Sequence, residues 1–301
     1  MSRTRKHLAH NSFDSVWELT EFLSSAEGEQ ISSQWADRAT SDAPGRDEWT
    51  ASRDYAHALE LAREGWPEGR EQMTDAVETL TPYVQAAIRA PSETLSVAGY
   101  APNIPAYVSG SPACMFSMDG DDTAGRAPIV RFLVNIGASH FIDASALFNQ
   151  GAALCAAVDY LEACGQSCEV RLVCRQESDK CTFDTYVTIK RAGEPIEHDR
   201  MDFFLGNASV LRRFIFRLNE LDGKSFNGLQ HGRGRPVDVT PEPAQVYLPV
   251  ANQHSFNDYC RTPQKALRYV MRHIEKAMAP EQFQRVGEDL EAAMTALGEA
   301  A

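Results

Sequence analysis

One central stretch, residues 126–191, constrains the fold most, because it alternates strand patterns with one long helix pattern. Residues 128–136 are almost continuously apolar, which is typical of a strand that is covered on both faces. Residues 145–165 then place their apolar positions on one helical face and end at a glycine, a favourable left-handed C-cap. Two more strand patterns follow at 168–174 and 182–190. A strand, a crossover helix, a second strand and a hairpin strand together predict an open α/β sheet.

The connections also predict strand directions. A helical crossover joins 129–136 to 168–174, so these two strands should be parallel, and residues 245–250 should join them in the same direction. A short polar turn leads into 182–190, which should therefore be antiparallel and lie at an edge of the sheet.

The rest of the chain divides into a helical first part and a longer α/β part. Residues 1–100 are predicted to be a helical N-terminal arm, and residues 101–301 an α/β body with C-terminal helices. The fold class is thus α/β, with an open, mostly parallel sheet. The helix patterns lie at 12–24, at 52–64, after the turn 66–69 with Met73, Val77 and Leu80, from Pro82, at 207–221, from Thr262 and at 280–297. Further strand patterns lie at 94–100, 113–118 and 201–205.

Charge and hydropathy limit the classes of partner that the chain is expected to bind. The formal net charge of −13 disfavours broad binding to duplex nucleic acid, because the phosphates would meet a repulsive field. No apolar run approaches the ~20 residues that a membrane-spanning helix needs. The basic segment Met1–His7 is not followed by the apolar run of a secretory signal. We therefore expect a cytoplasmic protein with no membrane contact.

The loop after the first central strand reads Asn135-Ile-Gly-Ala-Ser139. In its order of strands and helices, the region 126–278 resembles a von Willebrand factor A-type domain, whose D-x-S-x-S motif in this loop coordinates a divalent cation. Asn135, Gly137 and Ser139 stand at those three positions, so the resemblance implies a degenerate cation site. Magnesium needs hard, charged oxygen ligands. We expect no bound metal and no cofactor, and no stabilisation by magnesium.

Several short segments are similar to uncharacterised proteins of tailed bacteriophages. They are Trp49-Thr-Ala-Ser52, Ala58-Leu-Glu-Leu-Ala62, Gly65-Trp-Pro-Glu-Gly69, Val97-Ala-Gly-Tyr100 and Leu211-Arg-Arg-Phe214. This resemblance implies a phage-encoded protein in the host cytoplasm and implies no reaction.

A basic, glycine-rich segment lies in the long loop 221–242. It carries His231, Arg233 and Arg235, whose charges suit a phosphate or the backbone of a single strand. A set of helix arginines would extend this patch: Arg212, Arg213 and Arg217. The alternative is a solvated loop beside ordinary arginines on a helix surface. The length of the loop favours mobility in the free protein and ordering on a partner.

Two chemical alternatives have weaker patterns. Ser139 and His140 suggest a hydrolase, but adjacent residues on an extended chain point to opposite sides, and no G-x-S-x-G elbow is present. Four of the seven cysteines invite a zinc site: Cys164, Cys168, Cys174 and Cys181. Their spacings lack the paired C-x2-C pattern, and the ends of strand 168–174 are about 20 Å apart at ~3.3 Å per residue. Reduced, packed thiols are the simpler interpretation.

These observations lead to three functional hypotheses. The first is a non-enzymatic, phage-encoded adaptor or assembly protein that acts by binding another protein. The second is an accessory factor of phage replication or transcription that binds single-stranded DNA through the region of Arg212 and Arg233. The third is a hydrolase that uses the Ser139 loop.

Overall fold

The fold is described from a computed structural model of the chain. The structure describes residues 7–30, 41–42, 47–87, 93–118, 129–163, 166–177, 181–221, 235–242 and 245–277. The predicted helix at 280–297, and most of the long loop after residue 221, lie outside the described residues.

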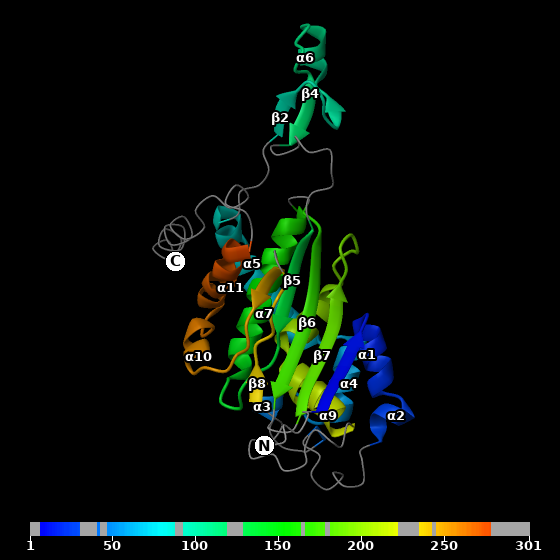
Figure 1. Cartoon of the computed structure of the whole chain (residues 1–301). Coiled ribbons are helices and arrows are strands. Elements are labelled where there is room, and N and C mark those ends of the chain that lie inside the picture. Colours follow the sequence, from blue (N-terminus) through cyan, green and yellow to red (C-terminus); the bar gives the residue numbers. More distant parts are fainter. Residues whose placement is uncertain are drawn as a thin grey trace, which may run out of the picture.

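An open, mixed, mostly parallel sheet of six strands forms the centre of the molecule (Figure 1). Five strands lie in the order β1-β7-β6-β5-β9, and β8 pairs with the C-terminal end of β6. Their bounds are β1 His7–Phe13, β5 Val130–Asn135, β6 Cys168–Glu177, β7 Cys181–Lys190, β8 Arg235–Val237 and β9 Gln245–Leu248.

The predicted strand directions are confirmed. β5 is parallel to β6 and to β9, while β7 is antiparallel to β6. The predicted edge position of residues 182–190 is wrong, because the whole length of β1 pairs in parallel with residues 181–187 of β7. The three consecutive polar residues His10, Asn11 and Ser12 concealed this strand, whose partner lies far away in the sequence.

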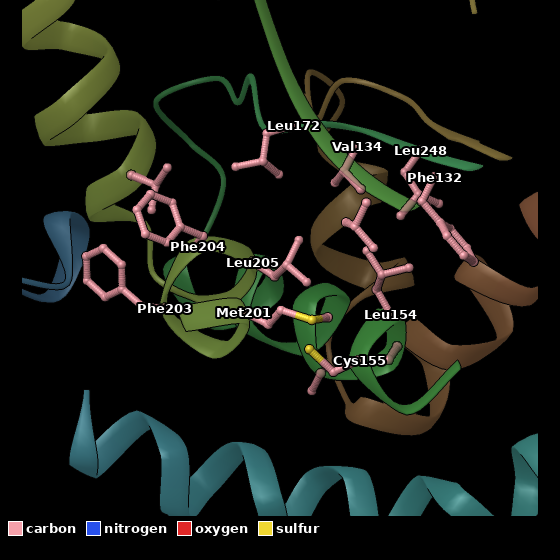
Figure 2. Close-up of a cluster of buried hydrophobic side chains, with 14 of the residues drawn as sticks. Phe132, Val134, Leu154, Cys155, Leu172, Met201, Phe203, Phe204, Leu205 and Leu248 are labelled. Carbon is pink, nitrogen blue, oxygen red and sulfur yellow. The ribbon is translucent and has the colours of Figure 1, made fainter. Parts of the chain in front are cut away.

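One face of the sheet is covered by helices, and this layer holds the main core (Figure 2). Phe132 and Val134 of β5 and Leu172 of β6 point toward helices α7 (Ala144–Ala163) and α8 (His198–Gly206). On the other face a smaller cluster forms around Leu133, Val173 and Val239. Burial on both faces explains the continuous apolar pattern of β5.

Helix α7 is buried on all sides rather than on one, because α5 (Pro67–Ala87) packs against it from outside the sheet layer. A Cβ on Gly151 would lie 2.5 Å from the Leu205 carbonyl oxygen, so this glycine permits the close approach of α7 and α8. Asn149 of α7 donates to the Cys260 carbonyl at 2.8 Å and anchors the loop before the last described helix.

The remaining helices of the body follow the expected pattern with a few differences. They are α1 Val16–Leu23, α2 Ala26–Glu29, α3 Asp47–Thr50, α4 Tyr55–Glu64, η2 Val210–Ile215, α9 Phe216–Leu221, α10 Ser255–Tyr259 and α11 Pro263–Ala277. Pro82 lies inside α5 and does not open a separate helix. Residues 201–205, predicted as a strand, belong to α8. The π-helical turns of η2 precede α9 within the predicted helix 207–221. No described helix is long and apolar enough to span a membrane.

A second, small antiparallel sheet lies between α5 and β5 in the sequence. It consists of β2 Glu93–Ser96, β3 Ala101–Pro102 and β4 Met115–Met118 in the order β2-β4-β3, with helix α6 Ile104–Val108 between β3 and β4. We call residues 93–118 the small-sheet unit; Figure 1 shows it at one end of the molecule, apart from the large sheet. The predicted division at residue 100 runs through this unit, and β1 places the N-terminal region in the main sheet.

Candidate functional site

Asn135 ends β5 at the carboxyl edge of the parallel strands, the place where open α/β sheets bind ligands. Its side chain is buried and its hydrogen bonds are satisfied within the protein. Nδ2 donates to the Val237 carbonyl at 3.0 Å and to Tyr247 Oη at 3.1 Å, while Oδ1 accepts from Gly137 N at 3.0 Å. Asn135 therefore has a structural role in which its amide group is required as both donor and acceptor.

Tyr247 continues this network away from the loop. Its hydroxyl donates to Asp238 Oδ1 at 2.8 Å and accepts from Val239 N at 3.1 Å, and Asp238 also accepts from Val250 N at 2.8 Å. Burial raises the pKa of Tyr247 to about 12, and the Asp238 carboxylate acts in the same direction. The network ties the segment after β8 to β9. In the described part of the chain, no group of three His, Cys, Asp or Glu side chains could hold a metal ion.

Ser139 and His140 are not arranged as a nucleophile and base. The Ser139 backbone N–H donates to the Ala251 carbonyl at 2.9 Å, and the His140 carbonyl accepts from Trp49 Nε1 at 3.0 Å. The next residue, Phe141, stacks on His254 with ring centroids 3.9 Å apart. Among the described residues no hydrogen bond joins Ser139 to His140.

The predicted arginine patch on the helix is corrected by the structure. Arg212 and Arg213 are 1% and 0% exposed, and Arg217 is also buried. Arg212 donates through Nη1 to the Trp49 carbonyl and through Nη2 to the Ile142 carbonyl at 2.6 Å, and its guanidinium lies 4.3 Å from the Trp49 ring centre. Burial lowers the pKa of Arg212 to about 10, while the Asp143 carboxylate opposes this effect. These side chains cannot form part of an exposed phosphate site.

Arg213 binds a strap that we define as Ser41–Asp42 together with residues 47–53. It donates to the backbone carbonyls of Ser41, Ser52 and Arg53, each at 3.0 Å, and to the Ser52 and Thr50 hydroxyls. Neighbouring polar groups add to the same contact: Ser209 Oγ donates to the Thr50 carbonyl at 2.7 Å. The arginines therefore serve to fix the strap against η2.

Arg217 also faces inward. Its guanidinium lies 4.1 Å from the ring centre of Tyr55 and 3.9 Å from the Asp42 carboxylate. Burial raises the pKa of Tyr55 to about 12, against the effect of Arg217. Arg235 is exposed at the start of β8. His231 and Arg233 lie outside the described residues, so the single-stranded DNA hypothesis stays a prediction that depends on this loop and Arg235.

The six described cysteines are free thiols: Cys114, Cys155, Cys168, Cys174, Cys181 and Cys260. Burial raises the pKa values of Cys168, Cys174 and Cys260 to about 12, which makes these thiols unreactive. Cys164, the other residue of the zinc alternative, lies outside the described residues.

The small-sheet unit has an unusual surface. Of the ten large hydrophobic residues that are exposed in the described part of the chain, six belong to this unit. Three of them, Ile104, Tyr107 and Val108, lie at i, i+3 and i+4 on α6 and are 60%, 68% and 78% exposed. The others are Leu95, Val97 and Tyr100. Such a concentration of apolar surface is typical of an interaction site.

The fold and these sites lie within a region that one family model covers. A family model for a domain of unknown function (DUF7192) matches residues 3–277. The chain belongs to this family. The DUF7192 match includes the strap, the buried arginines and the small-sheet unit. No curated protein and no solved structure matches the chain.

The predicted site residues of this DUF7192 chain thus separate into buried structural groups and a loop that lies mostly outside the described residues. The sequence predicted strands at 94–100 and 113–118, where β2 and β4 lie, but it missed the exposed surface of the small-sheet unit. A signal for it exists in the sequence. Residues 94–118 contain no charged side chain in a chain whose charged share is 24%. The aromatic and β-branched residues of such a stretch suit either a core or an interface, and the structure places them at the surface.

Proposed function

We propose that this protein is a non-enzymatic adaptor or assembly protein that binds another protein through the small-sheet unit. The observation that carries the proposal is the exposed apolar face of α6, formed by Ile104, Tyr107 and Val108. Exposed apolar side chains that are concentrated in this way gain free energy when a partner removes them from water, at roughly 25 cal/mol per Å². The unit thus supplies the driving force for association.

The sheet edge supports a role without catalysis. Enzymes of open α/β folds use the loops at the carboxyl ends of the strands. Here the side chains of Asn135, Tyr247 and Asp238 form hydrogen bonds with one another and with the backbone. The nearby Ser139 and His140 lack the hydrogen bond that would activate a nucleophile.

The resemblance to phage proteins and to von Willebrand factor A-type domains supplies a setting for this proposal. In this setting the protein acts in the host cytoplasm during infection, with a protein of the phage or of the host as its partner.

Site-specific photo-crosslinking tests the proposal. A benzophenone amino acid is placed at Tyr107 and, as a matched control, at Tyr259, a 51% exposed tyrosine of α10. In extract from cells that naturally produce the protein, position 107 should give a discrete protein adduct and position 259 should not. Equal labelling at both positions, or no adduct at 107, would contradict the proposed binding surface.

A further inference from the structure

The small-sheet unit has almost no interior of its own. Among its described side chains only Ser117 is buried, and the apolar side chains of β2, α6 and β4 are half-buried or exposed. Folding units below about 40 residues usually need disulfides, metals or oligomerisation for stability. In the described chain Cys114 is a free thiol and no metal-binding group is found. Of these three means, oligomerisation is the one consistent with the structure.

From this we infer that the small-sheet unit is a homodimerisation element, and that its occupant is the same unit of a second copy of this chain. The inference rests on the proposed function and names its partner. In a twofold dimer, the apolar face of α6 in one copy packs on the same face of the other copy. Each copy therefore covers the exposed apolar side chains of its partner, and no other surface is required. The contact completes the missing core.

The lack of charge in the unit allows a second copy to dock there despite the negative charge of both bodies, and it favours a partner surface that is itself uncharged. Glu93 is the only charged residue of 93–118, and subtracting its charge from −13 leaves −12 on the rest of the chain. Two bodies of this charge repel when they approach within a Debye length of about 8 Å. The uncharged unit avoids that repulsion, and it offers a basic or an acidic partner no charge to pair with.

The available surface suits a small, reversible interface. The six exposed apolar residues of the unit have a total accessible surface on the order of 700 Å², which is below the ~800 Å² per partner that a stable interface of standard size buries. The sheet also leaves one edge suited to pairing. The outer strand β3 is short and contains Pro102, which has no N–H to donate, whereas β2 contains no proline and pairs only with β4 in the described chain.

Sedimentation velocity of the full chain over a wide range of concentration tests the inference. We expect a reversible dimer that is strengthened by salt, because salt screens the repulsion between the bodies. Tyr107→Glu should weaken the dimer by about thirtyfold or more, because it buries a charge at the contact. Val108→Ser is a milder second variant, and Tyr259→Glu is the matched control that should leave dimerisation unchanged.

The outcomes separate this inference from the proposed function. A chain that stays monomeric at all concentrations and salt levels, or a dimer that Tyr107→Glu does not weaken, overturns the homodimer. If the benzophenone at position 107 then captures a different protein, the proposed function stands with another partner. If it captures nothing, both are overturned. Circular dichroism of each variant shows whether the fold is retained.

Discussion

The η2 region and the small-sheet unit distribute their side chains in opposite ways. Around η2, Arg212, Arg213 and Arg217 are buried and hold distant parts of the chain. In the small-sheet unit, Tyr107 and Val108 are among the most exposed large side chains described. Burial of charge is tolerated only where hydrogen bonds replace water, and exposure of apolar surface is typical of interaction sites. The first region therefore stabilises the fold, and the second is available for a partner.

The largest effect in this comparison should come from Arg213→Met. Methionine keeps much of the side-chain volume but removes the donor to the carbonyls of Ser41 and Arg53, while the Ser52 carbonyl keeps the Thr50 hydroxyl as a donor at 2.8 Å. Each lost donor costs about 1–3 kcal/mol, so we expect a loss of roughly 4 kcal/mol in the free energy of unfolding. Chemical denaturation measures this loss.

Arg235→Met is the matched control for that variant, because Arg235 is exposed on β8 and should change stability by no more than about 0.5 kcal/mol. If Arg213→Met costs as little as the control, the strap is not held by this arginine. The contrast between the two regions would then lose its energetic basis.

A smaller loss in the free energy of unfolding is expected at Asn135. Its neutral side chain, like that of Arg213, forms hydrogen bonds within the protein. Asn135→Asp removes the Nδ2 donor to the Val237 carbonyl and to Tyr247, and places a carboxylate against these oxygens. We expect a loss of about 2 kcal/mol at neutral pH.

The pH dependence of Asn135→Asp has a definite sign. Burial raises the folded-state pKa of the new carboxyl above its unfolded value of about 3.9, although the Gly137 N–H still donates to one of its oxygens. The folded state then binds more protons than the unfolded state between these two pKa values, so the penalty grows as pH rises and shrinks toward acid. Asn252→Asp, at a half-buried position in the neighbouring loop, is the control. A penalty that does not depend on pH, or a stabilisation of the variant by magnesium, would contradict the structural role of Asn135.

The difference between the two regions also explains what could be predicted from sequence. The strands β5, β6, β7 and β9 carry local apolar patterns and simple connections, so their directions followed from the sequence. The burial of Arg213 could not follow, because it depends on a strap about 160 residues earlier in the chain. An arginine on an apolar helix has the same local pattern whether solvent or a distant segment covers it.

The position of β1 and the surface of the small-sheet unit were missed for related reasons. β1 has neither a continuous apolar run nor a strict alternation, because His10, Asn11 and Ser12 are consecutive polar residues, and its pairing with β7 is a long-range contact. For the unit, the sequence predicted strands at 94–100 and 113–118, and only the missing charges over 94–118 distinguish these strands from ordinary core segments. Hydrophobic patterns show which faces seek burial, and they do not show whether the partner is the same chain or another.

The smallest perturbation that tests the comparison is a thiol titration of the native protein, carried out in a Cys164→Ser background. Cys114 of the small-sheet unit is half-buried, whereas the other described cysteines are buried in the body. Burial raises the pKa of Cys174 to about 12, which lowers its reactive thiolate by about three thousandfold relative to an ordinary thiol of pKa ~8.5. One fast-reacting thiol per chain is therefore expected. Cys114→Ser should abolish this fast phase, and Cys174→Ser should leave it intact. If Cys114 reacts as slowly as the buried thiols even at high dilution, the unit is covered within a single chain and is not an open surface.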